Sequence, residues 1–188
     1  MRGLSMPLPR VLTALGVSLL FACTAKVDEP RYAVGDGAVA TLRNESGVTV
    51  WLGGCSVFGF QKREPTGWVD RGTPLVCFWE GFAQPVAARE LRQDHFQVPG
   101  EPGIWRLRYA TGLGCAADRP LSAQSCQSVG DVLTPTFEVV ELCAAATCGP
   151  QLGMPNWLCA DGSVGGPTDR CLRDLSSGQC GWEIRSCP

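Results

Sequence analysis

The spacing of the cysteines limits what this chain can fold into more than any other feature of the sequence. Of its 11 cysteines, Cys23 stands alone near the N-terminus and the other ten form two even groups. Four are spread over the middle of the chain: Cys55, Cys77, Cys115 and Cys126. Six crowd the end of the chain: Cys143, Cys148, Cys159, Cys171, Cys180 and Cys187. Because each group is even, each can close on itself through disulfides, which predicts two domains in an oxidising compartment.

Zinc is the competing explanation for so many cysteines. Zinc sites usually contain two cysteines separated by two to four residues, or cysteine together with histidine. The chain has no C-x-x-C motif, its closest pair is Cys143 and Cys148, and its only histidine is His95. We therefore predict disulfides, and we expect no metal and no other cofactor.

The first 23 residues have the pattern of an export signal. Arg2 and Arg10 precede the uncharged run 11–22, and a cysteine follows. A basic start, an apolar stretch and a small residue before the cleavage site are typical of a secretory signal peptide, here residues 1–22. The run is shorter than the roughly 20 residues that a transmembrane helix needs. The tetrapeptide Leu20-Phe21-Ala22-Cys23 resembles the lipobox of bacterial lipoproteins, although a residue smaller than Phe21 is usual there. The resemblance implies cleavage before Cys23 and lipidation of that residue.

Cysteine parity supports the lipoprotein interpretation. If Cys23 carries lipid, ten cysteines remain and all can pair, whereas an unpaired thiol is a reactive liability in an exported protein. Ordinary secretion, with Cys23 removed or left free, is the alternative. The residue after the cysteine is Thr24, which resembles the pattern of lipoproteins that are sorted to the outer membrane of Gram-negative cells. Whether the protein lies on the periplasmic or the surface face of that membrane stays open. Residues 23–37 are rich in charge, Pro and Gly, which predicts the lipidated cysteine followed by a short flexible tether.

Residues 38–142 show strand signals throughout. Trp105, Leu107 and Tyr109 alternate with arginines, which indicates a strand with one buried face. No long stretch has the apolar stripe of an amphipathic helix. About seven short strands separated by turns predict an immunoglobulin-like β-sandwich within a mainly β chain.

Three details of this region can be predicted from local patterns. Residues 39–44 and 48–52 alternate in polarity around the turn Glu45-Ser46-Gly47, which predicts a hairpin. Residues 75–79 are apolar and predict a further short strand. Trp51 lies opposite the apolar face of its strand, so among the six tryptophans we expect it to be exposed.

The segment Pro102-Gly103-Ile104-Trp105-Arg106 strengthens the fold prediction. It resembles the P-G-x-[YW]-R motif in the penultimate strand of bacterial immunoglobulin-like domains, and the resemblance covers roughly residues 38–142. It implies the fold and says little about chemistry, because this fold hosts many functions. Of the three ways to join the four cysteines of this region, Cys55–Cys77 with Cys115–Cys126 is preferred because each pair is local.

Residues 143–188 are predicted to form a small, disulfide-rich, loop-dominated module. Large apolar side chains are few, so the core cannot offset an entropy cost of roughly 1.5 kcal/mol per ordered residue. Three disulfides are needed, and all 15 connectivities stay open. The string from Gly153-Met154-Pro155-Asn156-Trp157 to Cys187-Pro188 resembles a small module at the C-terminal end of exported bacterial proteins. Cys159-Ala160-Asp161-Gly162 is weakly similar to Kazal-type and antistasin-type inhibitors, whose full spacings are not matched.

Little in the sequence points to catalysis. His95 follows Asp94, but neighbours on a strand point to opposite faces, so no catalytic residue is predicted. The carboxylates of Asp161, Asp169 and Asp174 fit no calcium-loop spacing.

The predicted function is therefore that of a non-enzymatic, lipid-anchored protein of the cell envelope. It binds or is displayed through the sandwich and the stapled module, with Ser163–Thr168 and Arg173–Gly178 as candidate binding loops. The alternative is a protease inhibitor that presents a rigid loop of the C-terminal module. Without residues 1–22 the chain has 14 basic and 18 acidic residues, and this net charge of −4 argues against nucleic acid as a partner. The expected partners are a membrane, through the lipid, and a protein or protease; the oligomeric state stays open.

Overall fold

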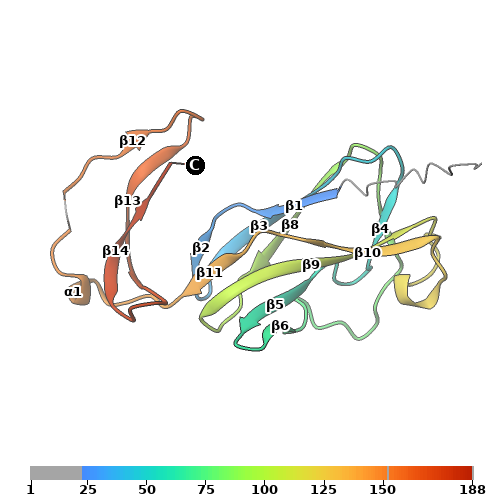
Figure 1. Cartoon of the computed structure of the whole chain (residues 1–188), viewed down its shortest axis with the longest axis horizontal. Helices are drawn as coiled ribbons and strands as arrows, with labels where there is room; N and C mark the ends of the chain where they lie inside the picture. The colour runs from blue at the N-terminus through green and yellow to red at the C-terminus, as the bar shows by residue number, and fades with distance from the viewer. Residues whose placement is uncertain (1–22, 152, 188) are drawn as a thin grey trace, which may run out of the picture.

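The computed structural model describes residues 23–151 and 153–187, so the predicted signal peptide lies outside the described residues. The chain is mainly β, and a sandwich and a C-terminal module follow one another along its long axis (Figure 1). Within the described ranges, no helix is long and apolar enough to cross a membrane.

The smaller sheet of the sandwich has the order β1-β3-β8 and is antiparallel throughout. Its strands are β1 (Cys23–Val27), β3 (Gly37–Asn44) and β8 (Leu91–Gln97). Along β3, Ala38, Ala40 and Leu42 are buried, whereas the residues between them are partly exposed. This alternation follows from the period of two in a strand that buries one face.

The larger sheet is built around one long central strand, β9. On one side β9 pairs with β10 and β11, and β11 pairs in parallel with β2. On the other side β9 pairs with β4 and β5, which continue to the edge strands β7 and β6. The strands are β2 (Arg31–Ala33), β4 (Val50–Leu52), β5 (Gly59–Glu64), β6 (Gly67–Asp70), β7 (Gln84–Val86), β9 (Gly103–Leu113), β10 (Ser128–Leu133) and β11 (Phe137–Val140).

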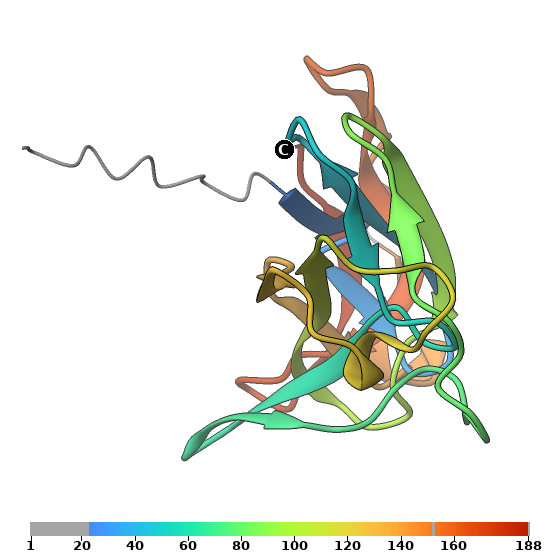
Figure 2. The same cartoon turned by 90° about the vertical axis from the view of Figure 1, so that its right-hand side faces the viewer.

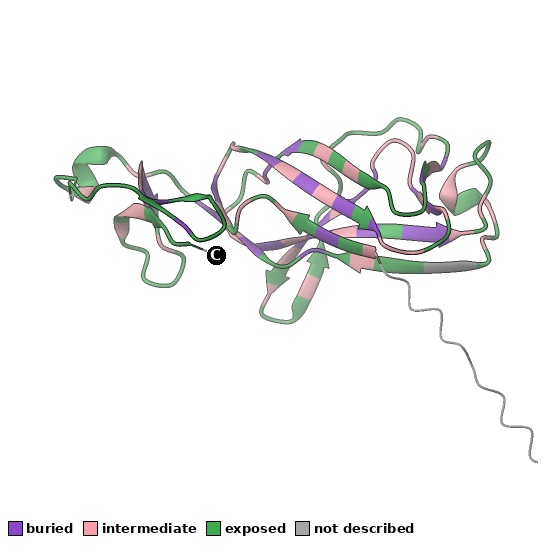
Figure 3. Ribbon diagram, turned by 90° about the horizontal axis from the view of Figure 1, so that it is seen from above, coloured by how far each residue is buried: buried purple, intermediate pink, exposed green. Residues whose placement is uncertain are grey.

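The two sheets bury a shared apolar core between them. Buried positions alternate with exposed ones along the strands of the sandwich, whereas most of the module is exposed (Figure 3). The predicted inward face of β9 is confirmed, because Trp105, Leu107 and Tyr109 are at most 2% exposed. The prediction of a mainly β chain with an immunoglobulin-like sandwich is therefore confirmed.

The prediction of a flexible tether at residues 23–37 is wrong. These residues contain β1 and β2, which pair within the two sheets, so the sandwich begins at Cys23 and not at Ala38. Ala25 and Tyr32 are buried, while four of the five charged residues that suggested a tether lie between them in the sequence. Edge strands need few apolar residues, so the charged outer face of this segment hid its buried face.

The hairpin predicted between residues 39–44 and 48–52 does not form, because β3 and β4 belong to different sheets. The fully buried side chain of Asn44 organises the corner between them. Its amide nitrogen donates to the carbonyl of Val86 at 3.0 Å, and its oxygen accepts from the Ser46 hydroxyl at 2.6 Å. A buried amide with both ends hydrogen-bonded holds the chain in a crossover between the sheets.

The C-terminal module is an antiparallel sheet of order β12-β13-β14, preceded by a short helix. Its elements are α1 (Ala145–Cys148), β12 (Trp157–Leu158), β13 (Val164–Arg173) and β14 (Cys180–Arg185). The hairpin of β13 and β14 gives it more regular structure than the loop-dominated module that the sequence predicted. Among its described residues, the buried ones are Cys159, Gly165, Gly166, Cys171 and Leu172.

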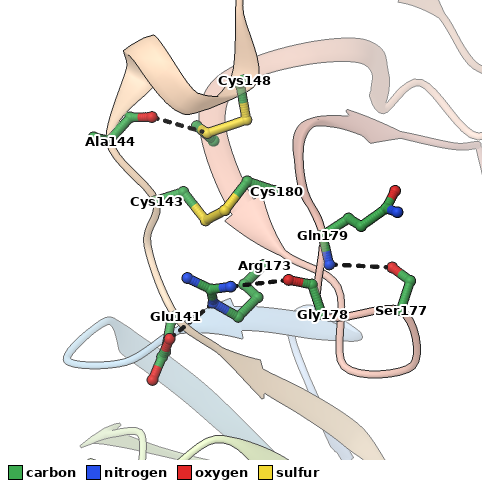
Figure 4. Close-up of a disulfide and its surroundings, with 10 residues drawn as sticks. Glu141, Cys143, Ala144, Cys148, Arg173, Ser177, Gly178, Gln179 and Cys180 are labelled. Atoms are coloured by element: carbon green, nitrogen blue, oxygen red, sulfur yellow. Dashed lines mark hydrogen bonds and ion pairs between the residues drawn. A yellow bond between two sulfur atoms is a disulfide. The ribbon is translucent and has the colours of Figure 1, made fainter.

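Disulfides occur in both parts of the chain. In the sandwich the structure joins Cys55 to Cys77 and Cys115 to Cys126, the local pairings that the sequence favoured. In the module the pairs are Cys143–Cys180, Cys148–Cys171 and Cys159–Cys187. The first two of these tie the α1 segment to the β13–β14 hairpin (Figure 4). In the chain-entropy model each bridge contributes roughly 3–4 kcal/mol to folding stability.

A small contact joins the module to the sandwich. Ala33 of β2, Val140 of β11 and Leu172 of β13 form a buried apolar cluster. Beside it, the guanidinium of Arg170 lies 2.5 Å from the carboxylate of Asp36, and both side chains are partly buried. The joint therefore combines apolar packing with a partly buried ion pair.

Candidate interaction surface

Five large apolar side chains are exposed within eight residues of the loop between β6 and β7. We call residues 75–82 the apolar loop. Phe78 is 104% exposed and Val76 is 90% exposed, and the other members of the set are Leu75, Trp79 and Phe82. Soluble proteins rarely expose such a concentrated apolar group unless it binds something.

Sequence reasoning missed this surface, because it assigned residues 75–79 to a strand. The structure shows an irregular loop there, and β7 instead occupies the place beside β4. The exposed tryptophans are Trp79 and Trp157, whereas Trp51 is partly buried in β4. Pro74, directly before the segment, was a signal against a central strand, because proline cannot donate a ladder hydrogen bond.

The base of the apolar loop is held by covalent and backbone contacts. Cys77 is bridged to Cys55, and the Cys55 amide donates to the carbonyl of Glu80 at 2.7 Å. Gly54 and Gly81 approach each other so closely that a Cβ on Gly54 would strike the backbone of Gly81. Gly81 also has a φ of +74°, which glycine adopts without strain. These contacts make the base of the loop rigid.

A second stapled loop supports the apolar loop from the side. In the loop 115–126, the carbonyl of Arg119 accepts from the Ala83 amide at 2.9 Å. The Ser122 hydroxyl donates to the Glu80 carboxylate at 2.6 Å. The disulfide-closed loop 115–126 thus braces the C-terminal end of the apolar loop.

The exposed tip is aromatic and uncharged. Trp79 and Phe82 pack edge to face with ring centroids 4.9 Å apart. No charged residue occurs in the sequence from Gly72 to Trp79. Rigid aromatic side chains of this kind dominate the binding energy of many protein interfaces.

The apolar loop lies across the sandwich from the start of β1. In Figure 2 the chain enters β1 on the upper left of the sandwich, whereas the loop between β6 and β7 projects to the lower right. In Figure 1 the start of β1 lies above the loop that follows β6. The loop and the N-terminal strand therefore face different surroundings.

Cys23 is the first residue of β1 and is half-buried; it is the one cysteine of the described chain without a disulfide. Its thiol donates a weak hydrogen bond to the side-chain oxygen of Asn44 at 3.8 Å. Burial, followed by the nearby carboxylate of Glu45, raises the pKa of this thiol. The residue borders a groove of about 400 Å³ between β1 and β10. The apolar lining of this groove consists of Ala25, Val132 and Leu133.

The structure does not bring together the titratable residues that the sequence analysis considered for catalysis or calcium binding. His95 is exposed on β8, while Asp94 is half-buried and its carboxylate lies 2.9 Å from the guanidinium of Arg92. Asp161 and Asp174 each accept hydrogen bonds within their own turns. Across residues 23–151 and 153–187, no group of three acidic, cysteine or histidine side chains could hold a metal ion.

The two candidate binding loops of the module differ from expectation. Ser163–Thr168 lies mostly within β13, where Gly165 and Gly166 are buried. Arg173–Gly178 contains the β13–β14 turn. Hydrogen bonds, above all from the Ser176 hydroxyl, hold the pKa of the Asp174 carboxyl well below its usual range. Of the two candidate loops, Arg173–Gly178 is therefore the one that forms an exposed, hydrogen-bonded turn.

Comparisons with known proteins identify no relative by sequence: no family model and no curated protein matches. Among solved structures the chain is similar to the ASH / PapD-like domain of human CEP192 (PapD-like domain 7). The TM-score is 0.29 and the identity 9%, over 63% of this chain and 86% of that chain. A β-glucosidase from Listeria innocua in complex with isofagomine gives a TM-score of 0.28 and 15% identity, over 62% of this chain and 16% of that chain. Similarity at this level carries no argument about function.

Proposed function

We propose that this protein is a lipid-anchored, non-enzymatic component of the cell envelope that binds a partner protein through the apolar loop. The observation that carries the binding role is the loop itself, with five exposed apolar side chains on a rigid base. Binding by a rigid segment avoids most of the entropy cost of ordering a flexible one.

The anchor rests on the chain before and at Cys23. Ten of the eleven cysteines are paired, which supports export to an oxidising compartment. Cys23 is left over and follows the apolar run 11–22. Because Cys23 begins β1 directly, a lipid on this residue would hold the sandwich against the membrane without a spacer. The outer membrane is the proposed destination, on the basis of Thr24.

The opposite placement of the two features favours a protein over a lipid as the ligand of the loop. A lipid on Cys23 would keep the start of β1 at the bilayer. The apolar loop lies across the sandwich from that point, so it would face away from the membrane (Figure 2). We therefore assign the lipid to Cys23 and a protein partner to the loop.

Site-directed photocrosslinking in cells tests the binding role. A photoreactive phenylalanine analogue replaces Phe78, and as a control it replaces His95, which is exposed on the β8 edge. We expect one discrete crosslinked protein from position 78, lost when Trp79→Ala is added, and none from position 95. The same products from both positions, or none from position 78, would contradict the proposal.

Fractionation tests the anchor separately. Cys23→Ser keeps the size of the side chain and removes the lipid attachment, so we expect the variant to leave the membrane fraction or to accumulate unprocessed. His95→Ala is the matched control and should fractionate like the wild type. A Cys23→Ser protein that stays membrane-bound and fully processed would refute the anchor and leave the loop proposal standing.

A protease panel tests the alternative function. We expect no saturable inhibition by the purified protein. Inhibition of one protease that is lost on replacing the turn residues Ser176 and Ser177 would replace our proposal with that of an inhibitor. Those residues organise the exposed turn of the module.

A further inference from the structure

A bulge in β13 contains one carboxylate, that of Asp169. The register of β13 against β14 shifts between Pro167 and Cys171, so the residues between them lack regular partners. Asp169 in this bulge has a φ of +58°, and only one other non-glycine residue of the described chain, Arg89, has a positive φ. Bulges often re-aim a side chain next to a binding site, and such backbone conformations concentrate at functional positions.

Asp169 borders a pocket of about 70 Å³ in the module. Four of the residues that line it have apolar or aromatic side chains: Met154, Pro167, Trp182 and Ile184. Asp169 is the one charged residue among the described residues of the lining. A single water needs about 10–15 Å³ by the same measure, so the pocket has room for a group of several heavy atoms.

Hydrogen bonds hold the polar groups around the pocket in place, and one carboxylate oxygen of Asp169 can still accept a hydrogen bond. The side-chain amide of Gln151 donates to one oxygen of Asp169 at 3.0 Å, and the indole of Trp182 donates to the carbonyl of Gly149 at 3.2 Å. The second oxygen of Asp169 accepts no hydrogen bond from any residue that the structure describes. An incoming donor can therefore reach this carboxylate.

The nearest basic side chain in the sequence does not neutralise Asp169. Arg170 lies 2.5 Å from Asp36 of the sandwich and 3.9 Å from Glu183. Its charge is thus committed to the joint between the two domains. The pocket keeps a net negative charge beside an aromatic wall.

We propose that this pocket binds an arginine side chain of a partner protein. The aliphatic stem would pack against Trp182 and Met154, and the guanidinium would donate to Asp169. Guanidinium groups pair with carboxylates through parallel hydrogen bonds and pack well on aromatic rings, so charge and shape both favour arginine. This contact is independent of both the apolar loop and the lipid on Cys23.

The test uses the mature protein with its disulfides intact and N-acetyl-arginine amide as the probe. The uncharged isostere N-acetyl-citrulline amide is the control ligand. We expect the indole signal of Trp182, assigned with Trp182→Phe, to shift saturably with the arginine probe, with a dissociation constant on the order of 1 mM. The citrulline probe should bind at least about tenfold more weakly, because it lacks the charge.

Two variants make the result specific to the pocket. Asp169→Asn keeps the fold, because asparagine tolerates a positive φ, and it should abolish the saturable shift. Asp161→Asn removes an exposed carboxylate elsewhere in the module and should leave binding unchanged. Equal shifts with citrulline, retained binding in Asp169→Asn, or no saturable shift up to about 10 mM probe would each overturn the proposal.

Discussion

The sandwich and the C-terminal module maintain their structures by different means. The sandwich buries aromatic and aliphatic side chains from two facing sheets, including Leu107, Tyr109 and Phe137. Among the described residues of the module, five are buried, and two of these are glycines and two are bridged cysteines. A chain too short to build an apolar core can therefore substitute covalent bonds for it.

Disulfides serve a different purpose in each region. In the sandwich all four bridged cysteines lie outside the strands: Cys55–Cys77 spans β5 and β6 and holds the base of the apolar loop, and Cys115–Cys126 closes the neighbouring connection between β9 and β10. In the module all three connect segments of the chain that would otherwise share little buried surface. The same bond shapes a surface in one region and maintains the fold in the other.

Reduction of the disulfides should produce the largest difference in stability between the two regions. With a reductant the module loses three bridges worth roughly 3 kcal/mol each, and it has almost no core to compensate. We expect amide protection along β13 and β14 to disappear while β3, β9 and β11 stay protected. Hydrogen exchange measured by NMR on the full chain tests this. Joint loss of both regions in one transition would show that the sandwich depends on its bridges too.

Truncation of buried and exposed leucines should give the next largest contrast. Leu107→Ala in the sandwich removes a fully buried side chain and should lower the free energy of unfolding by about 2–5 kcal/mol. Leu158→Ala in the module removes a side chain that is 76% exposed and should change it by less than about 0.5 kcal/mol. Chemical denaturation compares the two. Similar losses would mean that the module has a core after all.

The joint offers a smaller effect. Arg170 pairs with Asp36 where both side chains are about 30% exposed, whereas Arg173 pairs with Glu141 where both are about half exposed. Solvent weakens exposed ion pairs. Arg170→Ala should therefore lower the free energy that holds the module against the sandwich by about 1 kcal/mol, and Arg173→Ala should lower it by less. ¹⁵N relaxation should then show faster independent motion of the module in the first variant. If the module moves equally in the two variants, the apolar cluster around Leu172 alone holds the joint together.

The smallest effect is expected at low pH in the β13–β14 turn. The pKa of Asp174 is lowered by its hydrogen bonds, mainly from Ser176, so its folded value lies below the unfolded value of about 3.9. Such a carboxylate stabilises the fold above that value, and the contribution disappears as pH falls through the folded pKa. Carboxyl ¹³C titration should show the pKa of Asp174 rising in Ser176→Ala. If the pKa of Asp174 is unchanged in this variant, the hydrogen bond from Ser176 is not the cause of its low value.

Local pattern predicted one part of the fold well. The alternation of Trp105, Leu107 and Tyr109 reports burial of one face, and the structure buries all three. The same reasoning was wrong at β1, where the charged residues around Ala25 concealed a paired strand. It was wrong again at residues 75–79, because apolar composition is the same for a core strand and an exposed binding loop. Burial depends on which partners are available, and that is not a local property.

The sequence by itself determined an even set of ten cysteines apart from Cys23, a signal-like start and a chain of short strands. Each of these depends on composition or on neighbours within a few residues. Only the tertiary structure decided the three bridges of the module, the corner at Asn44 and the exposure of Phe78 and Trp79. These features require segments far apart in the chain to meet, and the free energy of that meeting belongs to the whole fold and not to any one segment.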